Sequence, residues 1–133
     1  MSTGSVVHPQ DFRVDETWLV FQLNDVPIRT VQHGDFDCLV LMDAASCYIV
    51  AQAMIEATAD EPSLLECKQL LKEGRAQSGR LPQTLIIPDE LRADIVVREA
   101  ARLRIQVVRM PEARLTILTR EARDGFRRHV QGG

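Results

Sequence analysis

Residues 38–55, CLVLMDAASCYIVAQAMI, contain two apolar runs on either side of Asp43-Ala44-Ala45-Ser46. Neither run has the spacing of apolar residues that marks an amphipathic helix. Asp and Ser both favour turns, because their side chains form hydrogen bonds with nearby backbone groups. The stretch therefore predicts two antiparallel strands, over residues 37–43 and 47–55, joined by a short turn. Asp43 either makes this turn or is a carboxylate that ends a strand and takes part in chemistry.

The residues before this hairpin predict two more strands and an arm. Residues 17–23, TWLVFQL, are rich in aromatic and β-branched side chains, and residues 28–32 alternate well enough for a short strand. Asn24-Asp25 ahead of Pro27 predicts a turn between them. Residues 1–16 are polar and rich in turn-forming residues, so we expect a loosely ordered N-terminal arm.

After residue 55 the pattern changes to helices that alternate with strands. Asp60, two residues before Pro62, predicts the N-cap of a first helix, and Gly74 predicts its end. The inward face of this helix is expected to consist of Leu64, Cys67 and Leu71. Two short strands are expected at residues 84–87 and 105–109.

Two further helices are each preceded by a proline. Asp89, directly after Pro88, predicts the N-cap of the second helix. Ile95 and Glu99 fall on its polar face. The inward stripe predicted by helical spacing is Ala93, Val96, Val97, Ala100 and Ala101. The third helix follows Pro111, and its predicted inward face is Leu115, Leu118, Ala122 and Phe126.

This order of elements predicts the fold class. Strands joined through helices lie parallel with right-handed crossovers, whereas the early hairpins extend the same sheet in antiparallel fashion. We therefore expect a single α/β domain over residues 17–131, with a mixed sheet flanked by helices.

Composition excludes several classes of protein. The chain has 133 residues, of which 45% are hydrophobic and 26% charged, as in ordinary globular domains. The three cysteines lack CxxC spacing, so free buried thiols are expected rather than a disulfide or a zinc site. Residues 1–10 lack the features of a signal peptide, and no apolar run reaches the roughly 20 residues that span a bilayer. We expect a cytoplasmic protein without membrane contact.

The net charge of −3 conceals an asymmetry between the two halves of the chain. Residues 1–66 carry two basic and eleven acidic side chains, a net −9, and residues 67–133 carry fourteen basic and eight acidic, a net +6. The second half either forms a basic face for phosphates or neutralises the first half on folding. The acidic total favours neutralisation, so we expect weak or no binding of nucleic acid.

Several short motifs follow one another in a set order. Trp18 lies in the first strand, residues 39–46 form an apolar strand ending in Asp-x-x-Ser, and Ile49-Val50 begins the next strand. Residues 82–89 and 103–107 then provide a proline-led strand with an aspartate and a further strand. This order resembles the integrase and transposase branch of ribonuclease H-like proteins, from residue 18 to about residue 130. The resemblance implies a ribonuclease H-like fold.

The resemblance also implies where catalytic residues would lie. In that branch the Asp-x-x-Ser aspartate closes a hairpin, and the first catalytic aspartate lies three residues after the Trp. That position is Phe21 here, and a phenyl ring cannot bind a divalent metal. Asp89 matches the second aspartate, but the glycine that follows it in the family is replaced by Glu90-Leu91. An alternative alignment, with Asp43 ending the first strand, restores a carboxylate at the first position.

Two-metal phosphoryl transfer needs several converging carboxylates, because oxygen ligands must hold two hard cations. The candidates are Asp25, Asp43, Asp89 and Glu121. Each also has a structural interpretation, as a turn residue, a helix cap or a solvated helix charge. We therefore favour no catalytic or metal-binding residue and expect no cofactor. Magnesium or manganese is needed only if the chain is a divergent metal-dependent nuclease or a transposase-like phosphoryl-transfer domain.

The chain also resembles a family of small bacterial proteins with a domain of unknown function. The shared features are the early strand with Trp18, the turn aspartate, Pro82 before the strand at residues 84–87, and Pro111 before the last helix. No activity carries over from that family. We expect a stand-alone, catalytically silent domain that associates with itself or with another protein. The candidate interaction residues are Ile95, Arg120, Arg123 and Arg127.

Overall fold

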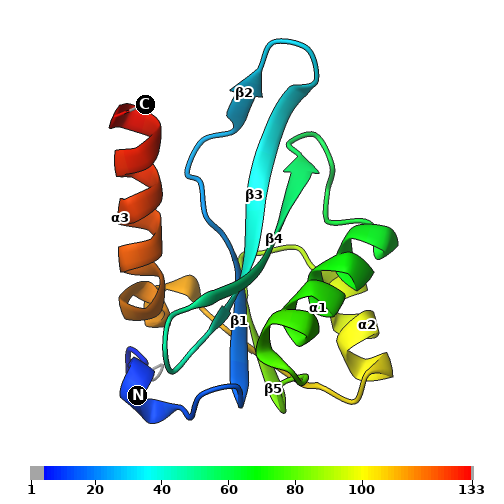
Figure 1. The fold of residues 1–133 in the computed structure, drawn as a ribbon, viewed down its shortest axis with the longest axis vertical. Coiled ribbons are helices and arrows are strands. Elements are labelled where there is room, and N and C mark those ends of the chain that lie inside the picture. The colour runs from blue at the N-terminus through cyan, green and yellow to red at the C-terminus, as the bar shows by residue number, and fades with distance from the viewer. Residues whose placement is uncertain (1–4, 133) are drawn as a thin grey trace.

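The computed structural model describes residues 5–132, which fold into a six-stranded sheet with helices on both faces (Figure 1). The elements in chain order are η1 (Pro9–Asp11), β1 (Thr17–Gln22), β2 (Ile28–Thr30), β3 (Gly34–Asp43), β4 (Ile49–Glu56), α1 (Leu64–Ser78), β5 (Thr84–Pro88), α2 (Asp94–Arg102), β6 (Gln106–Met110), η2 (Glu112–Arg114) and α3 (Thr116–Gly132). Within the described part of the chain, none of the helices is both long and apolar enough to cross a membrane.

The sheet is mixed, as the order of elements predicts. β1 lies at its centre, antiparallel to β3 and parallel to β5, and β5 in turn pairs in parallel with β6. β4 is antiparallel to β3 on the other side. β2 pairs with the part of β3 that extends beyond β1. The α/β class and the mixed sheet flanked by helices are confirmed.

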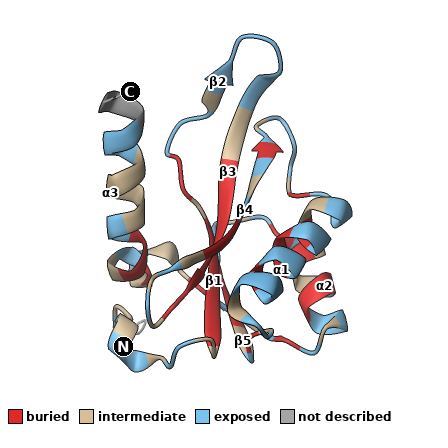
Figure 2. Cartoon of the chain, viewed as in Figure 1, coloured by how far each residue is buried: buried red, intermediate tan, exposed pale blue. Residues whose placement is uncertain are grey.

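Both faces of the sheet are covered, and β1 contributes to two separate cores. Alternate side chains of a strand point to opposite faces. Trp18 and Val20 belong to the core beneath α1 and α2, whereas Leu19 and Phe21 belong to the core beneath α3. All four are fully buried, and Figure 2 shows this buried centre around β1. Burial on both faces explains the continuous apolar run of this strand.

The prediction for α1 is wrong at both ends. Ser63, not Asp60, is the N-cap, and it forms a capping box with Glu66. Gly74 does not end the helix but lies buried within it, where an added Cβ would come within 2.8 Å of the Trp18 ring. The helix continues to Gly79, which adopts the left-handed conformation with φ of 84°.

The start of α2 also differs from the prediction. The helix begins at Asp94, so Asp89 is not its N-cap. Instead, the Glu61 carboxylate accepts hydrogen bonds from the backbone N–H groups of Asp94 and Ile95, at 2.6 and 3.4 Å. Ile95 is half-buried against the core beneath α1 and α2, and Glu99, expected in solvent, is 4% exposed.

The inward face predicted for α3 is confirmed. Leu115 and Leu118 are buried, and Ala122 and Phe126 pack against the same core. The segment before β1 also contacts this region, because the backbone N–H of Val7 donates to the carbonyl of Arg114 at 2.9 Å. Phe12 packs on the same core. Val7 and Phe12 of the predicted N-terminal arm thus contact the domain, whereas residues 1–4 of that arm lie outside the described residues.

Candidate functional site

Asp43 forms the turn between β3 and β4. Its carboxylate is 1% exposed and accepts hydrogen bonds from the N–H and hydroxyl of Ser46, at 2.8 and 2.7 Å. The backbone N–H of Asp15 donates to the other carboxylate oxygen at 2.7 Å. Cys47 completes the turn with a positive φ of 59°. The Asp43 carboxylate therefore satisfies backbone donors within the fold.

The sheet register separates Asp43 from Asp89. Asp43 pairs with Trp18 near the beginning of β1, and Trp18 pairs with Leu85 near the beginning of the parallel strand β5. Asp89 follows Pro88, at the carboxyl end of β5. The two aspartates consequently lie toward opposite ends of the sheet. They cannot share a metal pair, whose ions lie about 4 Å apart in two-metal enzymes.

A cleft lies where β1 and β5 end. Its volume is about 290 Å³. The residues that line it are Gln22, Asn24, Asp25, Pro88, Glu90, Leu91, Glu112 and Arg123. They come from the end of β1, the loops after β1 and β5, and the α3 side of the molecule. Carboxyl ends of parallel strands are the usual position of ligand sites in α/β sheets.

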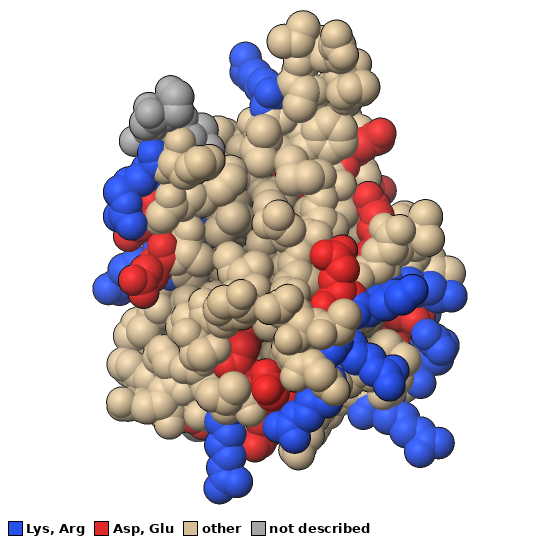
Figure 3. Space-filling view, viewed as in Figure 1, with Lys and Arg blue, Asp and Glu red and all other residues tan. Residues whose placement is uncertain are grey.

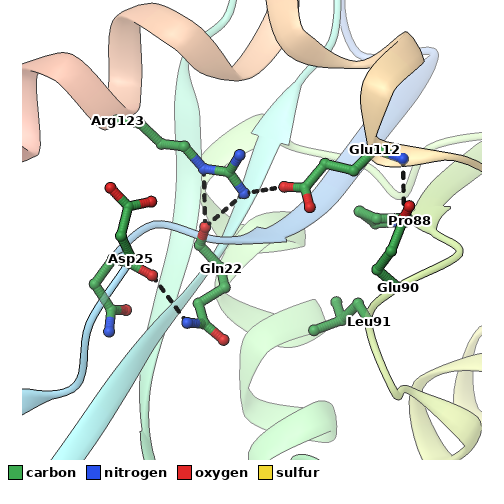
Figure 4. A pocket seen from close by; sticks show the side chains of 8 residues that line it. Gln22, Asp25, Pro88, Glu90, Leu91, Glu112 and Arg123 are labelled. Carbon is green, nitrogen blue, oxygen red and sulfur yellow. Dashed lines mark hydrogen bonds and ion pairs between the residues drawn. The ribbon is translucent and has the colours of Figure 1, made fainter.

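The Arg123 guanidinium points into this cleft (Figure 4). It donates to the carbonyl oxygen of Gln22, at 3.2 Å from Nε and 2.9 Å from the terminal nitrogen, and it forms an ion pair with Glu112. Its central carbon lies 5.3 Å from the centre of the Phe21 ring, within cation–π range. Because only 19% of the side chain is exposed, Arg123 is part of the wall and not a surface charge.

The loop after β5 is fixed by the neighbouring strand and by η2. Arg109 donates to the carbonyl oxygen of Pro88 at 2.9 Å, and the N–H of Asp89 donates to Met110 at 2.8 Å. Glu90 accepts a hydrogen bond from the backbone N–H of Glu112 at 2.9 Å. The Asp89 side chain is exposed and does not line the cleft.

Asp25 lines the cleft and also contacts Arg127 on α3. Its carboxylate accepts a hydrogen bond from Arg127 Nε at 2.8 Å, and this bond lowers the pKa of Asp25 below its ordinary value. Arg127 also pairs with Asp124 at 2.7 Å. The Asp25–Arg127 pair links the acidic first half of the chain to the basic second half.

The four candidate carboxylates do not converge. Asp25 lines the cleft, but Asp43 lies at the other end of the sheet and Asp89 is not among the lining residues. Glu121 is exposed on α3, next to a shallow hollow that it shares with Arg120 and Asp124. Within residues 5–132, no group of three or more His, Cys, Asp and Glu side chains could hold a metal ion. The donor set of the cleft therefore does not fit a pair of magnesium or manganese ions.

No described cysteine is suited to act as a nucleophile. Cys38 and Cys67 are buried and Cys47 is half-buried, and all three are free thiols. Burial raises the pKa of each thiol, to about 11 for Cys67. A thiol with a raised pKa holds its proton at neutral pH and reacts slowly.

Three residues of the cleft are not predicted as site residues in their observed roles: Gln22, Glu112 and Arg123. Gln22 contributes a backbone carbonyl, which no side-chain motif reveals. The sequence predicts Arg123 as an interaction residue, but its side chain is only 19% exposed, and it follows the buried Thr119 by four residues. This spacing puts Arg123 beside the inward stripe of α3. The spacing from Thr119 is the feature of the sequence that indicates an inward position for Arg123.

Comparison with models of protein families finds no match, and comparison with curated protein sequences finds none either. Solved structures do match. One is a chain of the simian T-cell lymphotropic virus intasome in complex with PP2A regulatory subunit B56 gamma, with a TM-score of 0.57 and 13% identity. The match covers 84% of this chain and 38% of that chain, so this chain spans well under half of its length.

A second similar structure is the HTLV-2 integrase catalytic core domain in complex with magnesium, in a dimeric form. The TM-score is 0.52 at 9% identity, and the match covers 82% of each chain. Identities this low establish the fold and nothing finer. The order of strands, the central β1 and the helices on both faces agree with this likeness. The chain has a ribonuclease H-like fold similar to that of retroviral integrase catalytic cores.

Proposed function

We propose that this protein is a catalytically silent ribonuclease H-like domain that acts by associating with protein. One observation carries the first part of this proposal. The Arg123 guanidinium lies over Phe21 and pairs with Glu112 in the cleft at the carboxyl ends of β1 and β5. The family resemblance assigns the first catalytic carboxylate to the position of Phe21.

A fixed cation in this position opposes metal binding in two ways. It neutralises Glu112, which is one of the few carboxylates that line the cleft. It would also repel a divalent ion brought into the same space, because like charges at short range interact strongly away from bulk water. Phosphoryl transfer with two metal ions requires the opposite arrangement, in which carboxylates surround an open position.

The absence of nuclease activity is tested by incubating purified protein with labelled duplex DNA, single-stranded DNA and RNA, each with magnesium and with manganese. We expect no cleavage above the buffer control. Asp89→Ala is the matched variant, since Asp89 is the candidate that aligns with a family aspartate. Metal-dependent cleavage by the wild type that disappears in Asp89→Ala would establish the alternative, a divergent nuclease or transposase-like domain.

Two of the three arginines expected to face a partner from α3 are engaged within the chain. Arg123 pairs with Glu112, and Arg127 pairs with both Asp25 and Asp124. Arg120 is exposed. This internal pairing supports weak binding of nucleic acid, of micromolar or poorer affinity at about 0.15 M salt.

Titration of labelled duplex DNA and single-stranded RNA measures this affinity, with Arg120→Glu plus Arg128→Glu as the variant. Nanomolar binding lost in that variant would contradict the expectation.

Association with protein is supported by two kinds of observation. The similar structures include an intasome in complex with PP2A regulatory subunit B56 gamma and an integrase core in a dimeric form. On this chain, Leu64, Leu65 and Met54 expose between 47% and 66% of their surface. Sedimentation at several concentrations distinguishes self-association from a monomer that needs another partner. The resemblance to small bacterial proteins adds no activity to this proposal.

A further inference from the structure

A second hollow lies on the other side of the sheet, between α1 and α2. Its volume is about 220 Å³. Its lining residues are Lys68, Leu71, Lys72 and Arg75 of α1, Leu81 of the next loop, and Glu99, Arg102 and Leu103 at the end of α2. We call this hollow the α1–α2 groove. Leu71 is 3% exposed, and Leu81 and Leu103 are half-buried, so the three leucines give the groove an apolar floor.

Four cations surround this floor. Lys68, Lys72 and Arg75 follow one another at helical spacing, so they lie along one side of α1. Arg102 faces them from α2, and all four residues are exposed. Figure 3 shows basic side chains gathered over the region of α1 and α2. The apolar floor and the basic rim together make an amphipathic surface.

Glu99, which also lines the groove, offsets part of this positive charge. Arg102 donates to Glu99 at 3.0 Å from Nε, and this hydrogen bond, together with the nearby charges of Arg102 and Lys68, lowers the pKa of that carboxyl. Among the residues that the structure describes, no ion pair engages Lys68, Lys72 or Arg75. The groove therefore differs from the cleft, where the arginine is already paired.

We propose that the α1–α2 groove binds a short acidic segment of another protein. One apolar side chain of this segment sits on the three leucines, and the Asp or Glu residues beside it pair with Lys68, Lys72 and Arg75. Recognition of acidic motifs by basic clusters and of apolar anchors by grooves are both established modes of peptide binding. The inference rests on the proposed association with protein and gives the chemistry of the partner.

The size and chemistry of the groove favour a peptide over other ligands. Small-molecule sites usually measure about 300–1,000 Å³ and enclose most of the ligand, whereas this groove is smaller. A nucleic acid backbone needs spaced cations but has no use for a leucine floor. An acidic peptide with an apolar anchor uses both features, and charge complementarity would also accelerate its association.

The test selects peptides of about twelve residues, long enough for an apolar anchor and its flanking acids, from a random displayed library on immobilised wild-type protein. Binders of the Lys72→Glu plus Arg75→Glu variant are removed first. We expect the enriched sequences to combine a Leu, Ile or Phe with flanking Asp or Glu. Enrichment of basic or wholly polar sequences, or no enrichment, would overturn the proposal.

The affinity of a synthetic selected peptide is then measured by fluorescence anisotropy. We expect a loss of about tenfold or more in the charge-reversal variant and in Leu103→Gln, and a fall in affinity with added salt. Arg120→Glu plus Arg128→Glu makes the same change of charge on α3 and should leave the affinity unchanged. Equal losses in both double variants would mean that only net charge matters. Far-ultraviolet circular dichroism checks the fold of each variant, and peptide-induced NMR shifts at residues 68–75 and 103 in the wild type locate the site.

Labelled duplex DNA and the nuclease assay separate this inference from the proposed function. DNA that competes with the peptide at equal concentration would identify the groove as a phosphate site and overturn the inference. If the peptide fails to bind but no cleavage is seen, the groove is misassigned while catalytic silence still stands. If cleavage dependent on Asp89 is seen, the proposed function fails whatever the groove binds.

Discussion

The cleft lies at the carboxyl ends of β1 and β5, whereas the α1–α2 groove lies between two helices on one face of the sheet, and the two sites use their cations differently. In the cleft, Arg123 is 19% exposed and pairs with Glu112 and the backbone of Gln22. In the groove, Lys72 and Arg75 are exposed over a leucine floor. The paired, largely buried Arg123 contributes to stability, whereas the exposed cations of the groove are the ones that we propose take part in recognition. Sequence composition alone does not distinguish the two.

Charge reversal at Arg123 should have the largest effect on stability. Arg123→Glu would bring a carboxylate against Glu112 and leave the Gln22 carbonyl without its donor. Solvent screens part of the pair because the Glu112 side chain is 36% exposed, but the lost hydrogen bond from a charged donor to Gln22 adds to the effect, so the total cost should be about 3 kcal/mol. Urea unfolding measures the change. The matched variant is Arg75→Glu in the groove, which should alter the free energy of unfolding by about 0.5 kcal/mol or less. Equal losses in the two variants would abolish the distinction between paired and unpaired cations.

Removal of the Asp43 carboxylate should have the next largest effect. Asp43→Ala leaves the backbone N–H groups of Asp15 and Ser46 without an acceptor in a buried turn, which should cost about 2 kcal/mol. Asp43→Asn keeps one acceptor oxygen and should lose less. Thermal unfolding followed by circular dichroism measures both. If Asp43→Ala is as stable as the wild type, the hydrogen bonds that the carboxylate accepts do not stabilise the turn, and Asp43 has no structural role that accounts for its burial.

Two helix glycines sharpen the comparison between the two sides of the sheet. Gly74→Ala places a Cβ within 2.8 Å of the buried Trp18 ring. The expected overpacking exceeds the gain in helix propensity, so the net loss should be about 1 kcal/mol. In Gly125→Ala on α3, the nearest atom lies 4.0 Å away on Arg128. That variant should gain up to about 1 kcal/mol. A stabilised Gly74→Ala would show that α1 can move away from the sheet.

The order of elements along the chain and most inward positions of the helices could be predicted because they depend on local periodicity, but Leu64 of α1 and Ala101 of α2, both predicted to face inward, are exposed. Apolar continuity in β1 predicts burial on both faces, and the stripe from Leu115 to Phe126 predicts how α3 packs. The ends of the helices could not be predicted in this way. Gly74 resembles a helix terminator locally, yet its lack of a side chain is required by Trp18, which is distant in sequence.

The cleft could not be predicted either, because it is also formed by residues that are distant in the sequence. Asp89 resembles a helix cap, but α2 is capped by Glu61 from the loop after β4. Arg123 lies beside an inward stripe, and its long side chain turns inward because Gln22 and Glu112 meet it there. A single sequence does not reveal such partners. The resemblance to integrases supplied the position of Phe21 but not the cation above it.

The smallest predicted effect concerns Asp25 at the rim of the cleft. Because the hydrogen bond from Arg127 lowers its pKa in the folded state, the pair contributes stability that is present above the unfolded value of 3.8 and lost as the pH falls through the folded value. Both side chains are about half exposed, so solvent screens the pair and its contribution should be smaller than those of Arg123, Asp43 and Gly74.

The free-energy difference between the wild type and Asp25→Asn, measured by urea unfolding, should therefore be positive at about pH 6 and shrink toward about pH 3. Added salt should reduce the difference at the higher pH, because the pair is screened. Asp35→Asn is the control, since the exposed Asp35 side chain forms no ion pair with any described residue. A difference that is constant with pH would mean that Asp25 stabilises its loop through turn geometry, and that Asp124 is the effective ion-pair partner of Arg127.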